Sequence, residues 1–209
     1  MLTTRARKLP AVLVPSKRYT PEDIPGFIGS PGLKDIESIV SMLPDYGNIF
    51  EIGTCFGKTA VAFAIAAECQ NKMLKVYTAD NAGIVQNDWH NIKEIKDFIT
   101  QSGSTSLVDA AKIYMAGYNI EFLNVTVDND YVFNDPLVCF YEDAEHSYDT
   151  LKENIEWGYK RLVSGGILCG HDFHSVFPDV VRLVEEFSKS INVEYNVVPP
   201  STVWWLRKP

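Results

Sequence analysis

The chain has 209 residues, of which 46% are hydrophobic and 22% are charged, and its formal net charge is −8 at pH 7. This length and composition are typical of one globular domain with a sizeable core. Because an acidic surface repels phosphate backbones, the charge disfavours nucleic acid as the partner and favours a small molecule.

The sequence indicates neither a membrane span nor a secreted protein. No apolar run approaches the roughly 18 residues of a spanning helix, and the apolar piece LPAVLVP behind the basic N-terminus is too short for a signal peptide. We therefore expect a cytoplasmic protein with no membrane partner. The cysteines form no CxxC pair, so reduced, structural thiols are expected and a disulfide is the alternative. They are Cys55, Cys69, Cys139 and Cys169.

In chain order, residues 1–30 are rich in proline, glycine and basic side chains. They predict an extended arm that drapes over the domain or over a partner subunit or, alternatively, a partly disordered tail, in front of one domain over residues 31–209. Helical and strand patterns then alternate along the chain. They predict a helix at 32–43, a strand at 48–52, a helix at 58–69 and a strand at 74–79.

The alternation is interrupted from 81 to 118, where the pattern predicts helices near 89–99 and 107–115 and no strand. We interpret this helical insertion after the second strand as a substrate lid or, alternatively, as the surface of a homodimer. Trp89 and His90 open its first helix and are candidates to line a substrate pocket.

Behind the insertion the alternation resumes. Strands are predicted at 120–125, 137–141 and 166–170, helices at 150–163 and 178–190, and a closing antiparallel hairpin at 193–198 and 202–206. These elements predict an α/β fold with a single doubly wound, Rossmann-like sheet. Ligands of such sheets bind outside the carboxyl ends of the strands, so the residues that follow each strand are the candidates for a site.

The first of these loops, in FEIGTCFGKT (50–59), fits neither of two common phosphate-binding motifs. The P-loop pattern ends here in Gly57-Lys58-Thr59 but needs a glycine at position 52, which is Ile52. The dinucleotide motif G-x-G-x-x-G, counted from Gly53, needs its second glycine at Cys55. A β-carbon there would block the close approach of a pyrophosphate.

What remains is E-x-G-x-x-x-G, formed by Glu51, Gly53 and Gly57. A carboxylate at the strand tip before a tight turn suits a ligand with a cationic amine and no phosphate, such as S-adenosylmethionine, and Gly53 would allow its close approach. The motif alone also fits any tight strand-to-helix turn. Asp80 ends the second strand, where an acid of a nucleoside-binding sheet accepts hydrogen bonds from both ribose hydroxyls. Together, the two acids predict a site for S-adenosylmethionine.

Three later segments carry a family resemblance. The blocks VCFYEDAEHSYDTL (138–151) and LVSGGILCGHDF (162–173) and the closing Ser201-Thr-Val-Trp204 resemble class I S-adenosylmethionine-dependent methyltransferases. Within that class they are similar to the small-molecule branch with the macrocin-type O-methyltransferases, over about residues 32–208. The resemblance implies seven strands in the order 3-2-1-4-5-7-6, with strand 7 antiparallel. Together with it, the expected cofactor contacts are Glu51, Gly53, Thr54, Phe56, Gly57, Asp80 and Asp143.

The resemblance also implies methyl transfer to a hydroxyl of a small molecule, with a sugar or glycosylated metabolite as the expected acceptor. A hydroxyl becomes a good nucleophile through a general base or a divalent metal. In metal-dependent relatives, acids at the positions of Asp143 and Asp172 bind the metal, which predicts a cation such as Mg²⁺. If no metal is bound, His171 or His146 is the candidate base. The expected catalytic residues are Asp143, His146 and His171.

Two other classes of function remain open. The first is a non-catalytic binding or assembly domain with the same fold. It is suggested by Glu145, where the family has aspartate, and by the unusual insertion. The second is a nicotinamide-dependent dehydrogenase, because such enzymes also have a sheet of this kind with an acid at the position of Asp80. Tight binding of NAD without binding of S-adenosylmethionine would favour the dehydrogenase.

Overall fold

The computed structural model describes residues 17–81 and 93–209. Its helices are η1 (Pro21–Asp23), α1 (Ser30–Met42), α2 (Lys58–Cys69), α3 (Lys93–Gln101), α4 (Leu107–Met115), α5 (Tyr148–Arg161) and α6 (Pro178–Ile191). Its strands are β1 (Tyr46–Ile52), β2 (Met73–Asp80), β3 (Ile120–Asn124), β4 (Leu137–Glu142), β5 (Leu162–Gly170), β6 (Asn196–Val197) and β7 (Trp204–Arg207). Every element predicted in these ranges is present; α2 and α4 have the predicted bounds, and the ends of the others are shifted. The helix expected to reach residue 163 ends earlier because Leu162 already pairs with Leu137 in the sheet.

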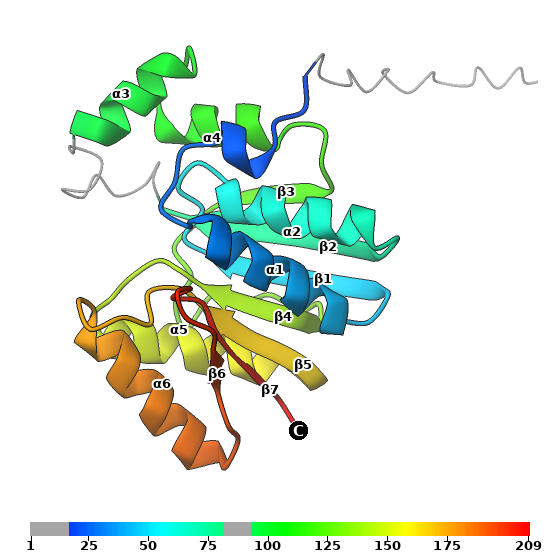
Figure 1. Ribbon diagram of the computed structural model, residues 1–209, viewed down its shortest axis with the longest axis vertical. Coiled ribbons are helices and arrows are strands. Elements are labelled where there is room, and N and C mark those ends of the chain that lie inside the picture. The colour runs from blue at the N-terminus through cyan, green and yellow to red at the C-terminus, as the bar shows by residue number, and fades with distance from the viewer. Residues whose placement is uncertain (1–16, 82–92) are drawn as a thin grey trace, which may run out of the picture.

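The strands form one seven-stranded sheet in the order β3-β2-β1-β4-β5-β7-β6 (Figure 1). The pairs from β3 to β5 are all parallel, whereas β7 runs antiparallel to both β5 and β6. The predicted strand order and the closing hairpin are therefore confirmed. The parallel strands all end at the same edge of the sheet, which brings the loops after β1, β2, β4 and β5 together.

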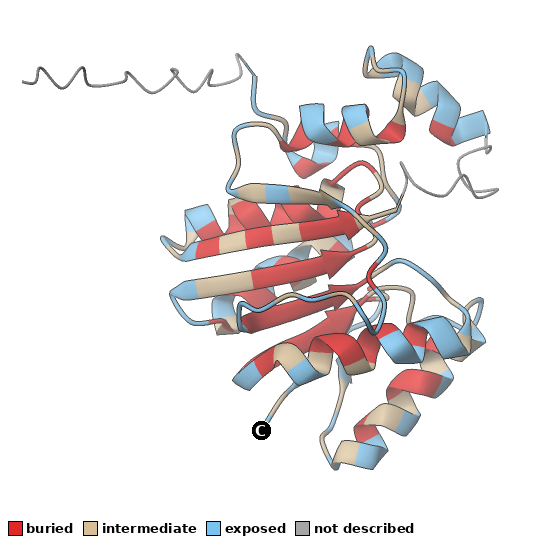
Figure 2. Ribbon diagram, turned by 180° about the vertical axis from the view of Figure 1, so that it is seen from behind, coloured by how far each residue is buried: buried red, intermediate tan, exposed pale blue. Residues whose placement is uncertain are grey.

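Helices cover both faces of the sheet, with α1 and α2 on one face and α5 and α6 on the other (Figure 1). Each layer has its own core. Ile39 of α1 and Val61 of α2 are buried in one core, and Leu151 of α5 and Val184 of α6 are buried in the other. Figure 2 shows the central strands buried between these layers. All six residues of β4 are buried, which explains why its sequence is a continuous run rather than an alternating pattern.

Residues 17–29 pack on the domain, which is one of the arrangements expected for the arm. Ile24 and Ile28 are buried, and the ring of Tyr19 meets the ring of Tyr114 edge-on at 5.0 Å. The insertion contributes α3 and α4, and α4 packs next to α2 and β3 (Figure 1). The predictions for residues 1–16, and for 82–92 with Trp89 and His90, fall outside the described residues and stay predictions.

All four cysteines are free, as expected, but Cys69 is exposed and Cys55 lines the cavity, so the structural role predicted for the thiols fits Cys139 and Cys169. Cys139 and Cys169 are fully buried in the neighbouring strands β4 and β5, where they behave as small apolar side chains. Within residues 17–81 and 93–209, none of the helices has the length and hydropathy needed to cross a membrane.

Candidate active site

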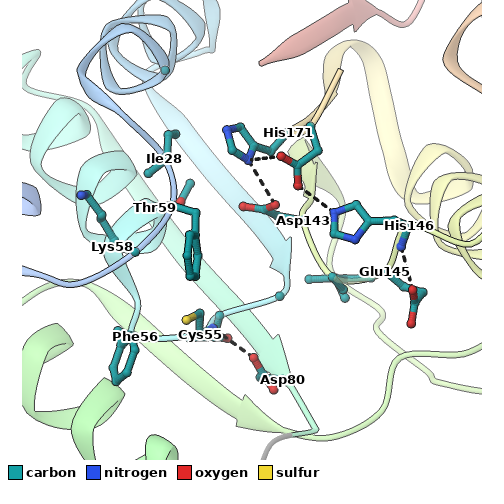
Figure 3. A pocket seen from close by; sticks show the side chains of 18 of the residues that line it. Ile28, Cys55, Phe56, Lys58, Thr59, Asp80, Asp143, Glu145, His146 and His171 are labelled. Carbon is teal, nitrogen blue, oxygen red and sulfur yellow. Dashed lines mark hydrogen bonds and ion pairs between the residues drawn. The ribbon is translucent and has the colours of Figure 1, made fainter. Parts of the chain in front are cut away.

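A cavity of about 780 Å³ opens at the carboxyl ends of the parallel strands, where the sequence placed the ligand. The loops after β1, β2, β4 and β5 line it, and residues 25–29, 31, 32 and 200–202 also form part of its wall. Figure 3 shows Asp80 on one side of this cavity and Asp143 with His171 on another. Carboxylates that are far apart in the sequence therefore face one common space.

Gly53, at the start of the loop after β1, has a left-handed φ of 97° and donates its N–H to the carbonyl of Ala79 at 2.9 Å. A β-carbon at this position would lie 2.1 Å from the carbonyl oxygen of Asp143. The glycine is therefore required by the packing of this loop against the end of β4. Gly53 also lines the cavity, so the close approach of a ligand stays a prediction beside this backbone contact.

Glu51 does not line the cavity, in contrast to the expectation. It is 1% exposed, pairs in register with Thr78 of β2 and accepts a hydrogen bond from the Thr78 hydroxyl at 2.5 Å. That hydroxyl also lies 2.6 Å from the hydroxyl of Thr54, which does line the cavity. Burial, partly offset by Thr78, raises the pKa of Glu51 well above its ordinary value. The negative charge predicted to bind an amine is thus disfavoured.

Asp80 lies as predicted, at the end of β2 and on the cavity wall. One of its carboxylate oxygens accepts a hydrogen bond from the N–H of Cys55 at 3.0 Å, which ties the loop after β1 to β2. Phe56 also lines the cavity, although its side chain is almost completely buried. Gly57 is not on the wall: it has a left-handed φ of 83° and packs so closely on Met115 that a β-carbon would collide.

Thr59, in the first turn of α2, is a candidate that sequence reasoning missed. It lines the cavity while only 6% exposed, and its hydroxyl has no hydrogen-bond partner within the described parts of the chain. The N-cap residue, Gly57, offers no side chain to the first N–H groups of α2, which favours an anion at this point. Lys58 lies on the same wall. The signal for it in the sequence is the Gly57-Lys58-Thr59 triplet, which is also the end of the P-loop pattern.

The predicted catalytic residues converge on another part of the wall (Figure 3). The Nδ1 atom of His171 lies 3.5 Å from Oδ1 of Asp143 and 3.1 Å from Oδ1 of Asp172. The other carboxylate oxygen of Asp172 lies 2.7 Å from Nε2 of His146, so Asp172 bridges two imidazoles. The His146 ring stacks on Phe177, with 4.2 Å between the ring centroids.

These contacts set the charges of the cluster. Burial disfavours the imidazolium of His171, but Asp143 and Asp172 outweigh it and raise the pKa of this residue to about 10. Burial is likewise outweighed at Asp172, whose pKa the two histidines hold well below its usual range. The hydrogen bond to Asp172 raises the pKa of His146. Because His171 is protonated at neutral pH, it has no lone pair with which to act as the expected base, and His146 is the better candidate.

The same residues fit a divalent cation. Asp143, His171 and Asp172 each offer one ligand atom, and these atoms lie within 4.8 Å of one another. Two carboxylates and an imidazole suit a cation such as Mn²⁺ better than Mg²⁺, which prefers oxygen ligands. A cation bound by all three residues would have to displace the proton of His171, so its affinity would increase with pH.

The strand order, with β7 antiparallel, and the cavity at the carboxyl ends of β1, β2 and β4 define the α/β methyltransferase fold. An rRNA methylase from Streptococcus thermophilus matches with 16% identity and a TM-score of 0.53, over 88% of this chain and 99% of its own. An S-adenosylmethionine-dependent O-methyltransferase from Thermotoga maritima matches with 11% identity and a TM-score of 0.57, over 88% and 67%.

A third solved structure with this fold is the TDP-rhamnose 3′-O-methyltransferase of calicheamicin biosynthesis. It is 14% identical with a TM-score of 0.54, and the match covers 86% of this chain and 81% of its own. No protein-family profile and no curated protein sequence matches the chain. At these identities the similarity establishes the fold, and the function has to be argued from the site.

Proposed function

We propose that the protein is an S-adenosylmethionine-dependent methyltransferase that methylates a hydroxyl group of a small molecule. One observation carries the proposal: a single cavity is lined both by groups suited to the donor, Asp80 and Thr59, and by a cluster suited to activating a hydroxyl, Asp143 with His146 and His171. The fold shared with known methyltransferases supports the same class of reaction.

On this proposal the donor is held by residues of the first two strand loops and of α2. Asp80 accepts hydrogen bonds from the ribose hydroxyls, because an ionised carboxylate is an acceptor for both. Thr59 and the N-terminus of α2 bind the carboxylate of the methionine part. Glu51 does not contact the donor. It accepts a hydrogen bond from the Thr78 hydroxyl, which in turn hydrogen-bonds to Thr54 and holds this residue in place. When bound, the donor supplies a methyl group that its sulfonium has already activated.

The chain's own residues activate the acceptor. Asp172 holds Nε2 of His146 at 2.7 Å, which orients the ring and makes it more basic, so His146 is the proposed base for the acceptor hydroxyl. Protonated His171 keeps the carboxylates of Asp143 and Asp172 in place. A divalent cation held by Asp143, His171 and Asp172 would lower the pKa of the hydroxyl and is the alternative means of activation.

The acceptor is proposed to be a small molecule, such as a sugar or a glycosylated metabolite, and not a nucleic acid. Among the described residues that line the cavity, Lys58 is the only lysine or arginine. The acids on the same wall are Asp80, Asp143, Glu145 and Asp172. This balance repels a polyanionic backbone. A known TDP-rhamnose 3′-O-methyltransferase with the same fold supports a sugar hydroxyl, while the rRNA methylase is the competing precedent.

Calorimetric titration with S-adenosylhomocysteine, followed by transfer of a labelled methyl group to a panel of sugars and glycosides, tests the proposal. We expect micromolar binding and label on an acceptor hydroxyl. Parallel reactions with EDTA, Mg²⁺ and Mn²⁺ decide whether a metal is required. No binding at millimolar ligand would refute the donor assignment, and transfer to RNA alone would refute the class of acceptor.

Thr59→Val is expected to weaken the binding of S-adenosylhomocysteine by roughly 10- to 150-fold, because a hydrogen bond to a charged group contributes on the order of 1.5–3 kcal/mol. Valine has nearly the same shape, so the fold should persist. The control ligand is 5′-methylthioadenosine, which lacks the amino-acid part and should bind wild type and variant equally. An equal loss for both ligands would mean that Thr59 does not bind the carboxylate.

A further inference from the structure

Part of the cavity wall belongs to the core layer between the sheet and α5. Ile52, Ala79 and Val127 line the cavity and are members of the core cluster that packs against α5. Asn154 of α5 brings an amide to the same cavity, although only 5% of the residue is exposed. A nearly buried polar side chain on a wall with apolar neighbours suits a flat, mostly apolar group with one polar edge.

Glu142, the last residue of β4, determines which end of that amide faces the cavity. Its Oε1 atom accepts a hydrogen bond from the backbone N–H of Ala144 at 3.3 Å and another from Nδ2 of Asn154 at 3.1 Å. Oε1 is thus the acceptor of both hydrogen bonds, and the NH₂ group of the Asn154 amide faces it. The carbonyl oxygen of Asn154 is therefore turned away from Glu142.

That carbonyl oxygen is available to a ligand. It makes no hydrogen bond to residues 17–81 or 93–209. It is also not one of the buried polar atoms of these residues that lack a hydrogen-bond partner, so it is not cut off from a ligand. Since it can only accept, it selects for a ligand that offers a donor at this place. Adenine fits: its ring is flat and largely apolar, and its edge carries a 6-amino group.

We propose that Asn154 recognises the 6-amino group of the donor's adenine and that Glu142 is the positioning residue that holds the amide in the accepting orientation. This inference rests on the proposed function, because it assumes that an adenosyl donor occupies the cavity. It makes a specific statement about selectivity: a purine with a carbonyl at the same carbon presents an acceptor to the Asn154 oxygen and is rejected.

The test compares the dissociation constants of S-adenosylhomocysteine and S-inosylhomocysteine, which differ in that group, by calorimetry. Wild type should prefer the adenosyl ligand by at least about tenfold, because a mismatch leaves a buried acceptor unpaired. In Asn154→Ala the preference should fall to about twofold or less. Thr150→Ala, which changes a cavity residue one turn earlier on α5, should keep the wild-type ratio.

Glu142 is tested through the same ratio. Glu142→Gln, which still offers a carbonyl oxygen to Ala144 and Asn154, should retain the preference, whereas Glu142→Leu should lose it. Equal affinity of wild type for the two ligands, a result that needs no variant, overturns the inference, as does an unchanged ratio in Asn154→Ala. Binding of neither ligand by wild type overturns the proposed function itself, and so the two failures are distinguishable.

Discussion

Replacing Asp172 by asparagine is expected to lower kcat for methyl transfer by a factor of about 10² to 10⁴, the usual contribution of general acid–base catalysis. Asp172 contacts both His171 and His146, and a neutral amide can neither balance the charge of the first nor hold the second in the same protonation state. The φ of Asp172 is 59°, a left-handed conformation that asparagine tolerates, so the backbone should be preserved. A kcat within about threefold of wild type would contradict this role.

The same substitution is expected to flatten the dependence of stability on alkaline pH. The pKa of His171 is raised from 6.5 to about 10, so its stabilisation is complete below pH 6.5 and is lost as the pH rises through 10. The pKa of Asp172 is lowered, so its stabilisation is present at neutral pH and is lost only in acid. Between pH 7 and 10, urea unfolding should show a smaller loss for the variant, in which only Asp143 still faces His171.

Asp179→Asn is the matched control for both measurements. It makes the same chemical change in an exposed ion pair of α6, where Asp179 lies 3.1 Å from Arg182. Exposed pairs of this kind contribute little to stability, so kcat and the pH profile of unfolding should stay close to those of wild type. If the control lost as much activity as Asp172→Asn, the contacts of Asp172 with the two histidines would not be the cause.

The sequence was sufficient for the architecture and for much of the cavity wall. Strand and helix patterns follow from local periodicity, and β4 was recognisable because a strand covered on both faces is apolar throughout. The carboxyl ends of parallel strands meet at one edge, and the strand order implied by the family resemblance makes the strands before Asp143 and His171 neighbours, so Asp80, Asp143 and His171 could be placed in one site without knowing any distance. These predictions need the order of the elements and the strand order that the resemblance implies.

What the sequence could not supply depends on the direction of individual side chains. Glu51 stands next to a cavity loop in the sequence, but its register with Thr78 directs it into the core. His171 is a reasonable base from the sequence alone, but its position between two carboxylates raises its pKa to about 10, which favours the protonated imidazole. Thr59 and Asn154 lie within ordinary helical patterns, and only their burial against the cavity distinguishes them from surface residues.

Gly53→Ala is expected to lower the free energy of unfolding by roughly 2–5 kcal/mol and to weaken donor binding. A left-handed backbone costs an L-residue about 1–2 kcal/mol. The added methyl group would also lie 2.1 Å from the carbonyl oxygen of Asp143 and 2.8 Å from the N atom of Ala144, so the backbone must move at a further cost of about 1–3 kcal/mol. Because Asp143 carries a carboxylate of the cavity, this movement reaches the site.

Gly103→Ala separates these two costs. Gly103 also has a left-handed φ, 74°, but a β-carbon there would meet no atom within 4 Å. Its substitution should cost only about 1–2 kcal/mol and leave the affinity for S-adenosylhomocysteine unchanged. The difference between the two variants in urea unfolding therefore gives the free-energy cost of the steric contact between the loop after β1 and the end of β4. The difference in calorimetry gives the effect of this contact on ligand affinity. Equal losses in the two variants would show that the backbone conformation of Gly53 alone explains the glycine, and that this contact does not position Asp143.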